Sequence, residues 1–326
     1  MFKALQTETG FPFEKANQEV FKGIVETIPS KSHDENHLID LVRDCDAVLS
    51  IYTPAKVTRK IIEAGKKLKV IGRYGVGTDN IDVTAATENG VAVVNCPIYH
   101  IPSVPEHVLA LIFALARKIP AADRSVRRGQ WNHEHFIGTE IEGKTLSILG
   151  LGRIGSTLAK KAVGLGMTVL GYDPYIPAGK ADVPGLRVVA FDQAVAEADF
   201  LAVGMPLTDK TRNSIGANVF SRMKKTAYLI NTARGPIVDE NALYEALKSG
   251  RIAGAALDVM AAEPPGLNHK LYEFDNVVIT PHTGGSTNES FARLGGLVAR
   301  DVVNVLQGKM PRHLFNPKVL EKLKLQ

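Results

Sequence analysis

Three side chains suited to proton transfer and carboxylate binding stand in the second half of this sequence of 326 residues: Arg234, Glu263 and His282. A histidine exchanges a proton near neutral pH, and an arginine presents a planar fork that matches a carboxylate or a keto acid. A glutamate beside the histidine would orient the ring and stabilise its charged form. Each also has an ordinary alternative when taken alone. Arg234 could be a surface charge or a phosphate contact, Glu263 could shape a turn before two prolines, and His282 could be a hydrogen-bonded loop residue.

Apolar runs precede all three residues and indicate the strands that would bring them together. We expect these strands at 227–231, 252–259 and 276–280. In doubly wound sheets, ligands bind beyond the carboxyl ends of the strands, so residues far apart in sequence can share one site. The same half of the chain alternates further, with an expected strand at 199–205 and expected helices at 191–198, 218–224, 241–248 and about 288–307.

A strand, a glycine turn, a helix and a second strand follow one another between residues 145 and 174. The apolar run 146–149 leads into Gly-Leu-Gly-Arg-Ile-Gly at 150–155, a helical pattern continues to about residue 165, and the next apolar run ends at Asp173. This order predicts a dinucleotide-binding βαβ unit, although a glycine-rich αβ turn without a ligand is the ordinary alternative.

Each glycine of the turn has a physical role in such a unit. Gly150 permits the tight turn, Gly152 lets the backbone approach a pyrophosphate, and Gly155 lets the helix pack closely on the strand. The helix N-terminus offers N–H groups and a positive dipole end to the phosphates. Asp173 would accept hydrogen bonds from ribose hydroxyls and repel a 2′-phosphate, and no arginine follows before Arg187. We therefore expect NAD rather than NADP as the cofactor.

The first hundred residues have an α/β pattern of their own, with expected strands at 46–52, 68–73 and 91–95 and a helix at 56–67. This part contains no Gly-x-Gly-x-x-Gly turn, so we expect it to be a substrate domain. Prolines at 97, 102 and 105 mark a boundary near residue 100.

Beyond the boundary, the helix expected at 106–118 is strongly apolar, and we expect it to pack between domains or against another subunit. The basic segment 124–138 reads as a loop. It carries the single tryptophan, Trp131, which we interpret as a packing residue rather than a direct contact in an active site.

Composition excludes several classes of protein. Two cysteines, Cys45 and Cys96, are too few for a disulfide framework, and the N-terminus shows no signal peptide, so we expect a cytoplasmic location. The longest apolar run is too short for a membrane span. The net charge of +5 comes from scattered residues, without a basic arm or zinc-ligand spacing. We expect no nucleic-acid partner and no bound metal, and interpret the charge as an attraction for small anionic substrates.

Five motifs in order make the sequence similar to the D-isomer-specific 2-hydroxyacid dehydrogenases over nearly its whole length. They are Gly-Val-Gly-Thr-Asp-Asn-Ile-Asp at 75–82, the glycine turn at 150–155, Asn-Thr-Ala-Arg-Gly at 231–235, Leu-Asp-Val at 257–259 with Glu263-Pro264, and Pro-His-Thr-Gly-Gly at 281–285.

The resemblance implies an α/β fold of two doubly wound parallel-sheet domains, with a Rossmann NAD-binding domain at 99–289 inserted into a flavodoxin-like substrate domain formed by 1–98 and 290–326. It also implies His282 as acid/base, Glu263 as its partner and Arg234 as the cation that orients a small anionic 2-hydroxy or 2-keto acid. The backbone N–H groups of Val76 and Gly77 would hold the substrate carboxylate. Asp258 would bind the nicotinamide carboxamide, and the cofactor would also be lined by Arg153, Ile154, Thr211, Thr232, Ala233 and Gly284.

Within the family, Lys-Val-Thr at 56–58 and Ile-Gly-Arg-Tyr-Gly at 71–75 resemble the phosphoglycerate dehydrogenase-like branch. Where that branch usually has an arginine that can meet a phosphate, this sequence has Tyr52. Hydroxypyruvate or glyoxylate is therefore an alternative to a phosphorylated substrate. An NAD-sensing corepressor or scaffold of the same fold is an alternative of another class. The apolar helix 108–116 and the loop of Trp131 suggest a homodimer formed through the cofactor domain.

Overall fold

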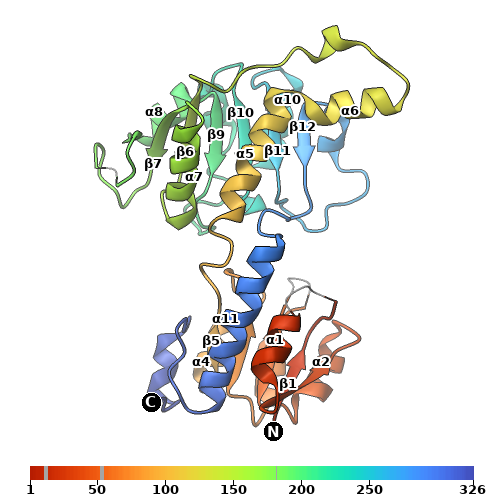
Figure 1. Cartoon of the computed structure of the whole chain (residues 1–326), viewed down its shortest axis with the longest axis vertical. Coiled ribbons are helices and arrows are strands. Elements are labelled where there is room, and N and C mark those ends of the chain that lie inside the picture. The colour runs from red at the N-terminus through yellow and green to blue at the C-terminus, as the bar shows by residue number, and fades with distance from the viewer. Residues whose placement is uncertain (11–13, 52–54, 181) are drawn as a thin grey trace. The chain divides into compact units, whose positions relative to one another are not determined.

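The structure is a computed structural model that describes residues 1–10, 14–51, 55–180 and 182–326. The chain forms two compact units (Figure 1). Unit 1 consists of residues 1–100 and 286–326, and unit 2 consists of residues 101–285. The boundaries expected from the sequence lie after residues 98 and 289. The assignment of 1–98 and 290–326 to a substrate domain and of 99–289 to an NAD-binding domain remains a prediction.

Unit 1 is built on a five-stranded sheet in the order β2-β1-β3-β4-β5, with every neighbouring pair parallel. Its strands are β1 (Phe2–Gln6), β2 (Val25–Pro29), β3 (Ala47–Ser50), β4 (Val70–Arg73) and β5 (Ala92–Val94). Its helices are α1 (Glu14–Phe21), α2 (Glu35–Val42), α3 (Arg59–Ala64), α4 (Val83–Glu88) and α11 (Asn288–Leu306), with a short 3-10 helix at Pro317–Glu321.

The central strands of unit 1 are apolar on both faces because helices cover both. All residues of β3 and β4 are buried. Helices α1 and α11 pack on one face, and α2, α3 and α4 pack on the other. At Gly72 the fit is so close that a Cβ atom would lie 2.6 Å from Cγ2 of Val302, on α11. The end of the chain is therefore an integral part of the core of unit 1.

Unit 2 contains a seven-stranded parallel sheet in the order β12-β11-β10-β9-β6-β7-β8. Its strands are β6 (Thr145–Leu149), β7 (Thr168–Tyr172), β8 (Leu186–Val188), β9 (Phe200–Val203), β10 (Tyr228–Asn231), β11 (Gly254–Leu257) and β12 (Val277–Ile279). Its helices are α5 (Ser103–Ala116), α6 (Ile119–Arg127), α7 (Arg153–Gly164), α8 (Phe191–Glu197), α9 (Ala217–Arg222) and α10 (Glu240–Lys248). Short 3-10 helices lie at His133–Phe136, Gly235–Ile237 and Lys270–Glu273.

The strand order of unit 2 reverses between β6 and β9, which pair directly, with Leu146 opposite Phe200. The chain runs outward from β6 through β7 to β8, and then returns to β9 and runs outward to β12. Helices α5 and α7 cover one face of this sheet, and α8, α9 and α10 cover the other. The predicted α/β fold with two parallel sheets is confirmed. Such a reversal is the point at which doubly wound sheets bind ligands.

Several details differ from the sequence analysis. Helix α5 buries nine residues, and its apolar side chains pack within unit 2 on β10, β11 and β12, so its hydrophobicity does not require another domain or subunit. The expected loop at 124–138 begins inside α6. Trp131 is 82% exposed, so it does not pack within the chain. The sequence analysis predicts no elements before residue 46, where the structure has β1, α1, β2 and α2. Of these, α1 is a polar helix that buries only Asn17 and Phe21 and therefore gives a weak apolar pattern.

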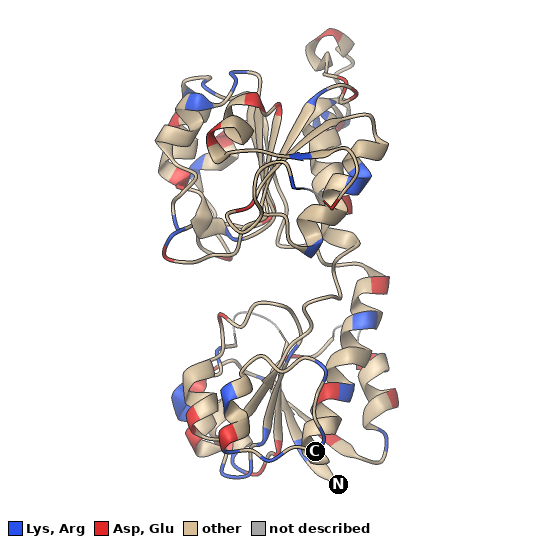
Figure 2. Ribbon diagram, turned by 90° about the vertical axis from the view of Figure 1, so that its left-hand side faces the viewer, with Lys and Arg blue, Asp and Glu red and all other residues tan. Residues whose placement is uncertain are grey.

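Residues of both charge signs are intermixed along the elements of each unit (Figure 2). This distribution agrees with the scattered charges in the sequence. Among the described residues, no helix is both long and apolar enough to cross a membrane.

Candidate active site

The predicted site residues of unit 2 follow the carboxyl ends of neighbouring strands. From one edge of the sheet inward, His282 and Gly284 follow β12, Asp258 and Glu263 follow β11, Thr232, Ala233 and Arg234 follow β10, Thr211 follows β9, Gly150 to Gly155 follow β6, and Asp173 follows β7. The residues proposed for acid–base chemistry thus come from three adjacent strands. The glycine turn lies across the reversal of strand order from them.

His282 and Glu263 are in direct contact. The distance from Nδ1 of His282 to Oε2 of Glu263 is 2.7 Å, and their side chains are 37% and 31% exposed. An ionised carboxylate can only accept, so Nδ1 carries the proton, and Nε2 is left for a reacting group. The backbone N–H of Met260 donates to Oε1 of Glu263 at 3.1 Å, which holds the carboxylate in place.

The electrostatics of the pair favour an ionised Glu263. Burial raises the pKa of a carboxyl group. For Glu263, the hydrogen bond and positive charge of His282, the N–H of Met260 and the charge of Arg234 outweigh burial, and the pKa lies below its usual value.

Arg234 lies in the turn that leaves β10, and Asn231 shapes this turn. The side chain of Asn231 is fully buried, accepts from the N–H of Ala233 at 3.0 Å and donates to the carbonyl of Arg234 at 3.0 Å. Gly235, the residue after Arg234, lies so near the loop after β11 that a Cβ atom on it would be 2.0 Å from the carbonyl of Met260. This close approach explains the glycine after Arg234 and brings the turn against the segment that carries Glu263.

The glycine turn fits a dinucleotide. Gly150 has a φ of 103° and lies where a Cβ atom would be 2.7 Å from the carbonyl oxygen of Gly204, so only glycine suits this position. A Cβ atom on Gly155 would be 2.1 Å from the carbonyl of Gly150. At Gly152, by contrast, a Cβ atom would meet nothing within 4 Å among the described residues, and Gly152, the N-cap residue of α7, has no side chain to cap the helix. Open space in front of a 12-residue helix is what a pyrophosphate needs.

Asp173 is connected to the same turn. One carboxylate oxygen accepts from the N–H of Leu151 at 2.9 Å, and the other accepts from the N–H of Tyr175 at 3.0 Å. Each oxygen has a further lone pair, so these bonds leave room for a ribose hydroxyl. The residue lies beside the glycine turn as expected, and its role in cofactor choice remains a prediction.

Arg153 and Ile154 form the first turn of α7, and Thr232 lies between β10 and Arg234. Thr211 closes an exposed turn after β9, where its hydroxyl donates to the carbonyl of Pro206 at 2.6 Å. Asp258 is 2% exposed, and its carboxylate accepts from the N–H groups of Thr283 and Gly284, each at 2.8 Å. The cofactor contacts of these residues remain predictions.

Sequence reasoning missed His107. It lies on α5, and its Nε2 atom is 3.1 Å from Oγ1 of Thr280 and 3.3 Å from Oδ1 of Asp258. The available signal was a histidine within an otherwise apolar helix, but periodicity cannot tell which strand end such a residue meets.

The residues predicted to hold the substrate carboxylate, Val76 and Gly77, lie in unit 1 after β4. The side chain of Asn95 donates to the carbonyl of Val76 at 2.7 Å, and Nε of Arg73 donates to the carbonyl of Gly77 at 2.8 Å. Arg73 is only 9% exposed, and its Nη1 donates to the carbonyl of Ile51 at 2.5 Å. These bonds fix the shape of the loop. Tyr52 lies outside the described residues.

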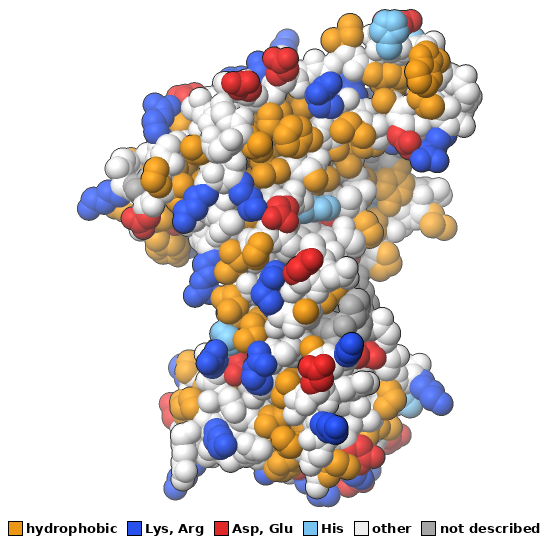
Figure 3. Space-filling model, in the orientation of Figure 1, with side chains coloured by type: hydrophobic (Ala, Val, Ile, Leu, Met, Phe, Trp, Pro, Cys, Tyr) orange, Lys and Arg blue, Asp and Glu red, His pale blue; other side chains and the backbone are white. Residues whose placement is uncertain are grey.

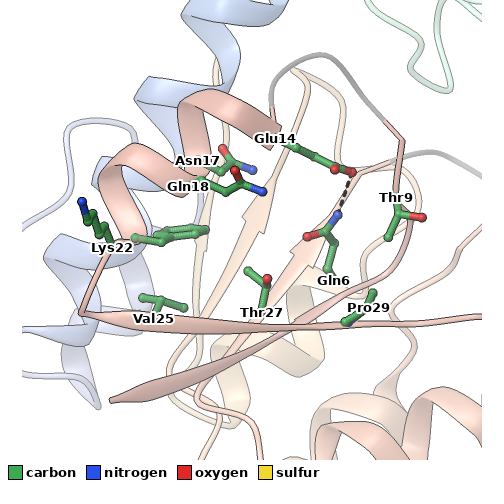
Figure 4. A pocket seen from close by; sticks show the side chains of 10 residues that line it. Gln6, Thr9, Glu14, Asn17, Gln18, Lys22, Val25, Thr27 and Pro29 are labelled. Atoms are coloured by element: carbon green, nitrogen blue, oxygen red, sulfur yellow. Dashed lines mark hydrogen bonds between the residues drawn. The ribbon is translucent and has the colours of Figure 1, made fainter.

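A pocket of about 450 Å³ lies in unit 1 (Figure 4) and contains none of the predicted site residues. Residues of α1, β1 and β2 line it, and many of them are polar. Nε2 of Gln6 donates to Oε1 of Glu14 at 3.1 Å, and the same oxygen accepts from the N–H of Gly10 at 2.6 Å. These contacts brace the first turn of α1.

Together, the strand reversal, the glycine turn and the open helix N-terminus define unit 2 as a dinucleotide-binding α/β domain. The sequence model of the family described as "D-isomer specific 2-hydroxyacid dehydrogenase, NAD binding domain" matches residues 109–284, more than half of the chain. The chain belongs to the D-isomer-specific 2-hydroxyacid dehydrogenase family. The predictions of this family and of NAD as the cofactor are confirmed.

Proteins named for different activities resemble the chain. A D-3-phosphoglycerate dehydrogenase of Methanocaldococcus jannaschii is 44% identical over 97% of this chain and 60% of its own length. A glyoxylate reductase of Korarchaeum cryptofilum is 38% identical over 87% of this chain and 86% of its own length. The solved structure of D-lactate dehydrogenase with NAD+ from Lactobacillus jensenii has a TM-score of 0.79 at 30% identity and covers 96% of this chain and 99% of that chain. The chain spans 60%, 56% and 56% of three D-3-phosphoglycerate dehydrogenases that it matches at 44% identity.

Proposed function

We propose that this protein interconverts a small D-2-hydroxy acid and its 2-keto acid with NAD. The observation that carries the proposal is the 2.7 Å contact between His282 and Glu263, which follow the carboxyl ends of their strands as the glycine turn does. Bound NADH would supply a hydride for the keto carbon. The remaining chemistry is proton transfer and charge stabilisation, for which this chain has suitable groups.

His282 acts as the acid in the reducing direction. Its Nδ1–H group is held by Glu263, so Nε2 gives its proton to the carbonyl oxygen of the keto acid, and the carboxylate stabilises the ring while it is charged. In the oxidising direction the neutral ring takes the hydroxyl proton. Arg234 would polarise the carbonyl oxygen and bind the substrate carboxylate as a planar fork. The N–H groups of Val76 and Gly77 would bind the same carboxylate.

For the substrate, we propose that hydroxypyruvate or glyoxylate is used at least as well as 3-phosphohydroxypyruvate. Recognition of a phosphate usually needs an arginine fork or several N–H groups. Tyr52 stands where the phosphoglycerate dehydrogenase-like branch usually has an arginine, and it offers a hydroxyl without charge. Nε and Nη1 of Arg73 already donate to backbone carbonyls. Lys56, which is exposed, offers a point charge without bidentate geometry. The relatives named above include a glyoxylate reductase, which agrees with this choice, and D-3-phosphoglycerate dehydrogenases, which favour the phosphorylated acid.

The test is the rate of NADH oxidation with hydroxypyruvate, glyoxylate and 3-phosphohydroxypyruvate under one condition. We expect kcat/KM for an unphosphorylated acid to equal or exceed the value for the phosphorylated one. A preference of about a hundredfold for 3-phosphohydroxypyruvate would refute the substrate proposal, because it needs about 2.7 kcal/mol of phosphate recognition. Binding of NADH without turnover of any keto acid would instead favour an NAD-sensing scaffold.

We also propose a symmetric homodimer formed through unit 2. Hydrophobic side chains gather over α5 on the face of unit 2 in view in Figure 3. The large exposed apolar residues of α5, α6 and the following segment are Phe113, Ile119, Val126, Trp131 and Ile137, with exposures of 37%, 54%, 49%, 82% and 75%. Such apolar groups favour association when they form one surface. Sedimentation should give a dimer at micromolar concentration, and Trp131→Ser with Ile137→Ser should shift it towards monomer. A monomeric unmutated protein would contradict the proposal.

A further inference from the structure

The carboxylate of Asp258 joins several segments of unit 2 at one buried point. Oδ1 accepts from the hydroxyl of Thr280 at 2.5 Å and from the N–H of Thr283 at 2.8 Å, and Oδ2 accepts from the N–H of Gly284 at 2.8 Å. The residue is 2% exposed, and these donors with His107 outweigh its burial, so the pKa of Asp258 lies below the usual value. The anion therefore organises the segment after β12.

His107 completes this network from α5. The hydroxyl of Thr280 donates its hydrogen bond to Asp258, so the hydroxyl oxygen can accept a hydrogen bond from another donor. Nε2 of His107 lies 3.1 Å from that oxygen and 3.3 Å from Oδ1 of Asp258, and both of these atoms are acceptors. The ring therefore carries a proton on Nε2 and donates it to this pair. Helix α5 is thereby connected to the ends of β11 and β12.

The network reaches His282 through the backbone. The N–H of His282 donates to the carbonyl of Asp258 at 2.8 Å, and its φ is 55°, a conformation that costs energy for a residue with a side chain. The packing beside it is tight, because a Cβ atom on Gly284 would lie 2.9 Å from Oδ2 of Asp258 and 3.5 Å from Cδ2 of His107. Surrounding hydrogen bonds must hold the backbone of His282 in this conformation. The bonds to the Asp258 carboxylate come from Thr280 on one side of His282 and from Thr283 and Gly284 on the other.

We propose that His107 is a positioning residue: its Nε2–H fixes the carboxylate of Asp258, which in turn holds the backbone of residues 282–284 so that the ring of His282 meets Glu263. This inference rests on the proposed function only for its effect on turnover. Its structural part concerns contacts within unit 2. His107 acts on the reaction through Asp258 and His282, without touching the substrate itself.

Two substitutions separate the donated proton from the shape of the ring. His107→Met keeps an unbranched side chain of similar reach and removes the donor, and His107→Gln supplies an amide N–H in its place. Thr280→Val is a second, nearly isosteric way to interrupt the network. The matched control is His313→Met in unit 1, because His313 also contacts a buried carboxylate, with Nδ1 2.9 Å from Oδ2 of Asp301.

Amide hydrogen exchange gives a readout that does not depend on activity. With His107→Met or Thr280→Val, we expect the amides of Thr283 and Gly284 to exchange about tenfold faster or more, and His107→Gln to restore most of the protection. His313→Met should leave these amides unchanged. In the keto-acid assay, His107→Met should lower kcat by about 10- to 100-fold, since small displacements of catalytic groups have effects of that size. KM for the keto acid should change less than kcat.

Unchanged exchange at Thr283 and Gly284 in both His107→Met and Thr280→Val would overturn the proposal. An equal loss of kcat in His107→Met and His107→Gln would also overturn it, because the shape of the ring rather than its donor would then matter. If the unmutated protein reduces no keto acid, the proposed function fails, while the exchange data still decide whether His107 holds the segment after β12.

Discussion

Glutamine in place of Glu263 keeps the shape of the side chain and removes its charge, so this change tests the electrostatic part of the proposed acid–base pair. The amide oxygen can still accept from Nδ1 of His282, while the amide nitrogen then takes the place of Oε1 and the bond from the N–H of Met260 is lost. It also lacks the negative charge that lies beside the His282 ring in the unmutated protein. We expect keto-acid reduction by Glu263→Gln to be impaired most where the ring must hold its proton against a low proton concentration.

The size of the effect follows from the contact. A hydrogen bond to a charged group contributes about 1.5–3 kcal/mol. The side chains of His282 and Glu263 are 37% and 31% exposed, so solvent screening places this contact at the lower end of that range. A loss of about 1.4 kcal/mol corresponds to about tenfold in rate and to about one pH unit in a titration. Reduction should therefore fall about tenfold on the alkaline side of the pH profile, and less on the acid side, where protons are plentiful.

The assay is kcat/KM for keto-acid reduction between about pH 5 and pH 9. The pH at which the rate halves should move down by about one unit in Glu263→Gln. Glu8→Gln is the control, because Glu8 contacts His33 at 3.3 Å with similar exposures, 24% and 38%, in unit 1. An equal loss at every pH would refute the reasoning, since it would indicate displaced geometry rather than a missing charge. An unmoved profile with an unchanged rate would remove Glu263 from the mechanism.

Three further predictions concern neighbouring residues. His282→Ala should lower turnover by a factor on the order of 10² to 10⁴ with NADH affinity kept, as measured by kinetics and fluorescence titration; largely intact turnover would place the proton donor elsewhere. The unmutated protein should strongly prefer NADH to NADPH, and Asp173→Ala should reduce this preference about tenfold or more in kcat/KM; equal use of both cofactors by the unmutated protein would contradict the role of Asp173. Because the pKa of Asp258 is lowered in the folded state, its ionised carboxylate stabilises that state above the unfolded pKa of about 3.9, and this stabilisation is lost as pH falls through the folded pKa. Between about pH 5 and pH 3, the urea midpoint of unfolding should therefore fall less in Asp258→Asn than in the unmutated protein.

Most strands of the two sheets, though not β1, β2 and β8, could be predicted because buried parallel strands have a strong sequence pattern. Runs such as Leu-Ser-Ile-Leu at 146–149 are apolar or small on both faces, as the structure requires with helices on each side. The edge strand β2 is different, since most of its residues are only partly buried or exposed, and it gave no usable pattern. For the same reason the polar helix α1 was not predicted. Local pattern is informative where burial is complete and weak at the rim of a domain.

The candidate site was predictable to the level of strand ends, and no further. Strand order and direction place Arg234, Glu263 and His282 after the carboxyl ends of neighbouring strands, and this placement follows from the alternation of elements. The distances do not follow from it. The 2.7 Å contact depends on the bond from Met260 to Glu263 and on the left-handed backbone at His282, and neither leaves a periodic signal. The same is true of His107, whose partner is determined by how α5 lies across the ends of β11 and β12.

The strand order also separates two requirements that would conflict on one loop. A pyrophosphate needs open backbone N–H groups and small residues, and the turn after β6 provides them with Gly152 facing open space. A proton donor needs a ring held rigidly by charged and hydrogen-bonded neighbours, and the segments after β11 and β12 provide these through Glu263 and Asp258. Because β10 and β9 lie between these groups, the helix dipole of α7 acts on an anion at its own N-terminus, while His282, the proposed proton donor, contacts the carboxylate of Glu263. Changes in the substrate-facing residues can therefore alter the chemistry without disturbing the cofactor turn.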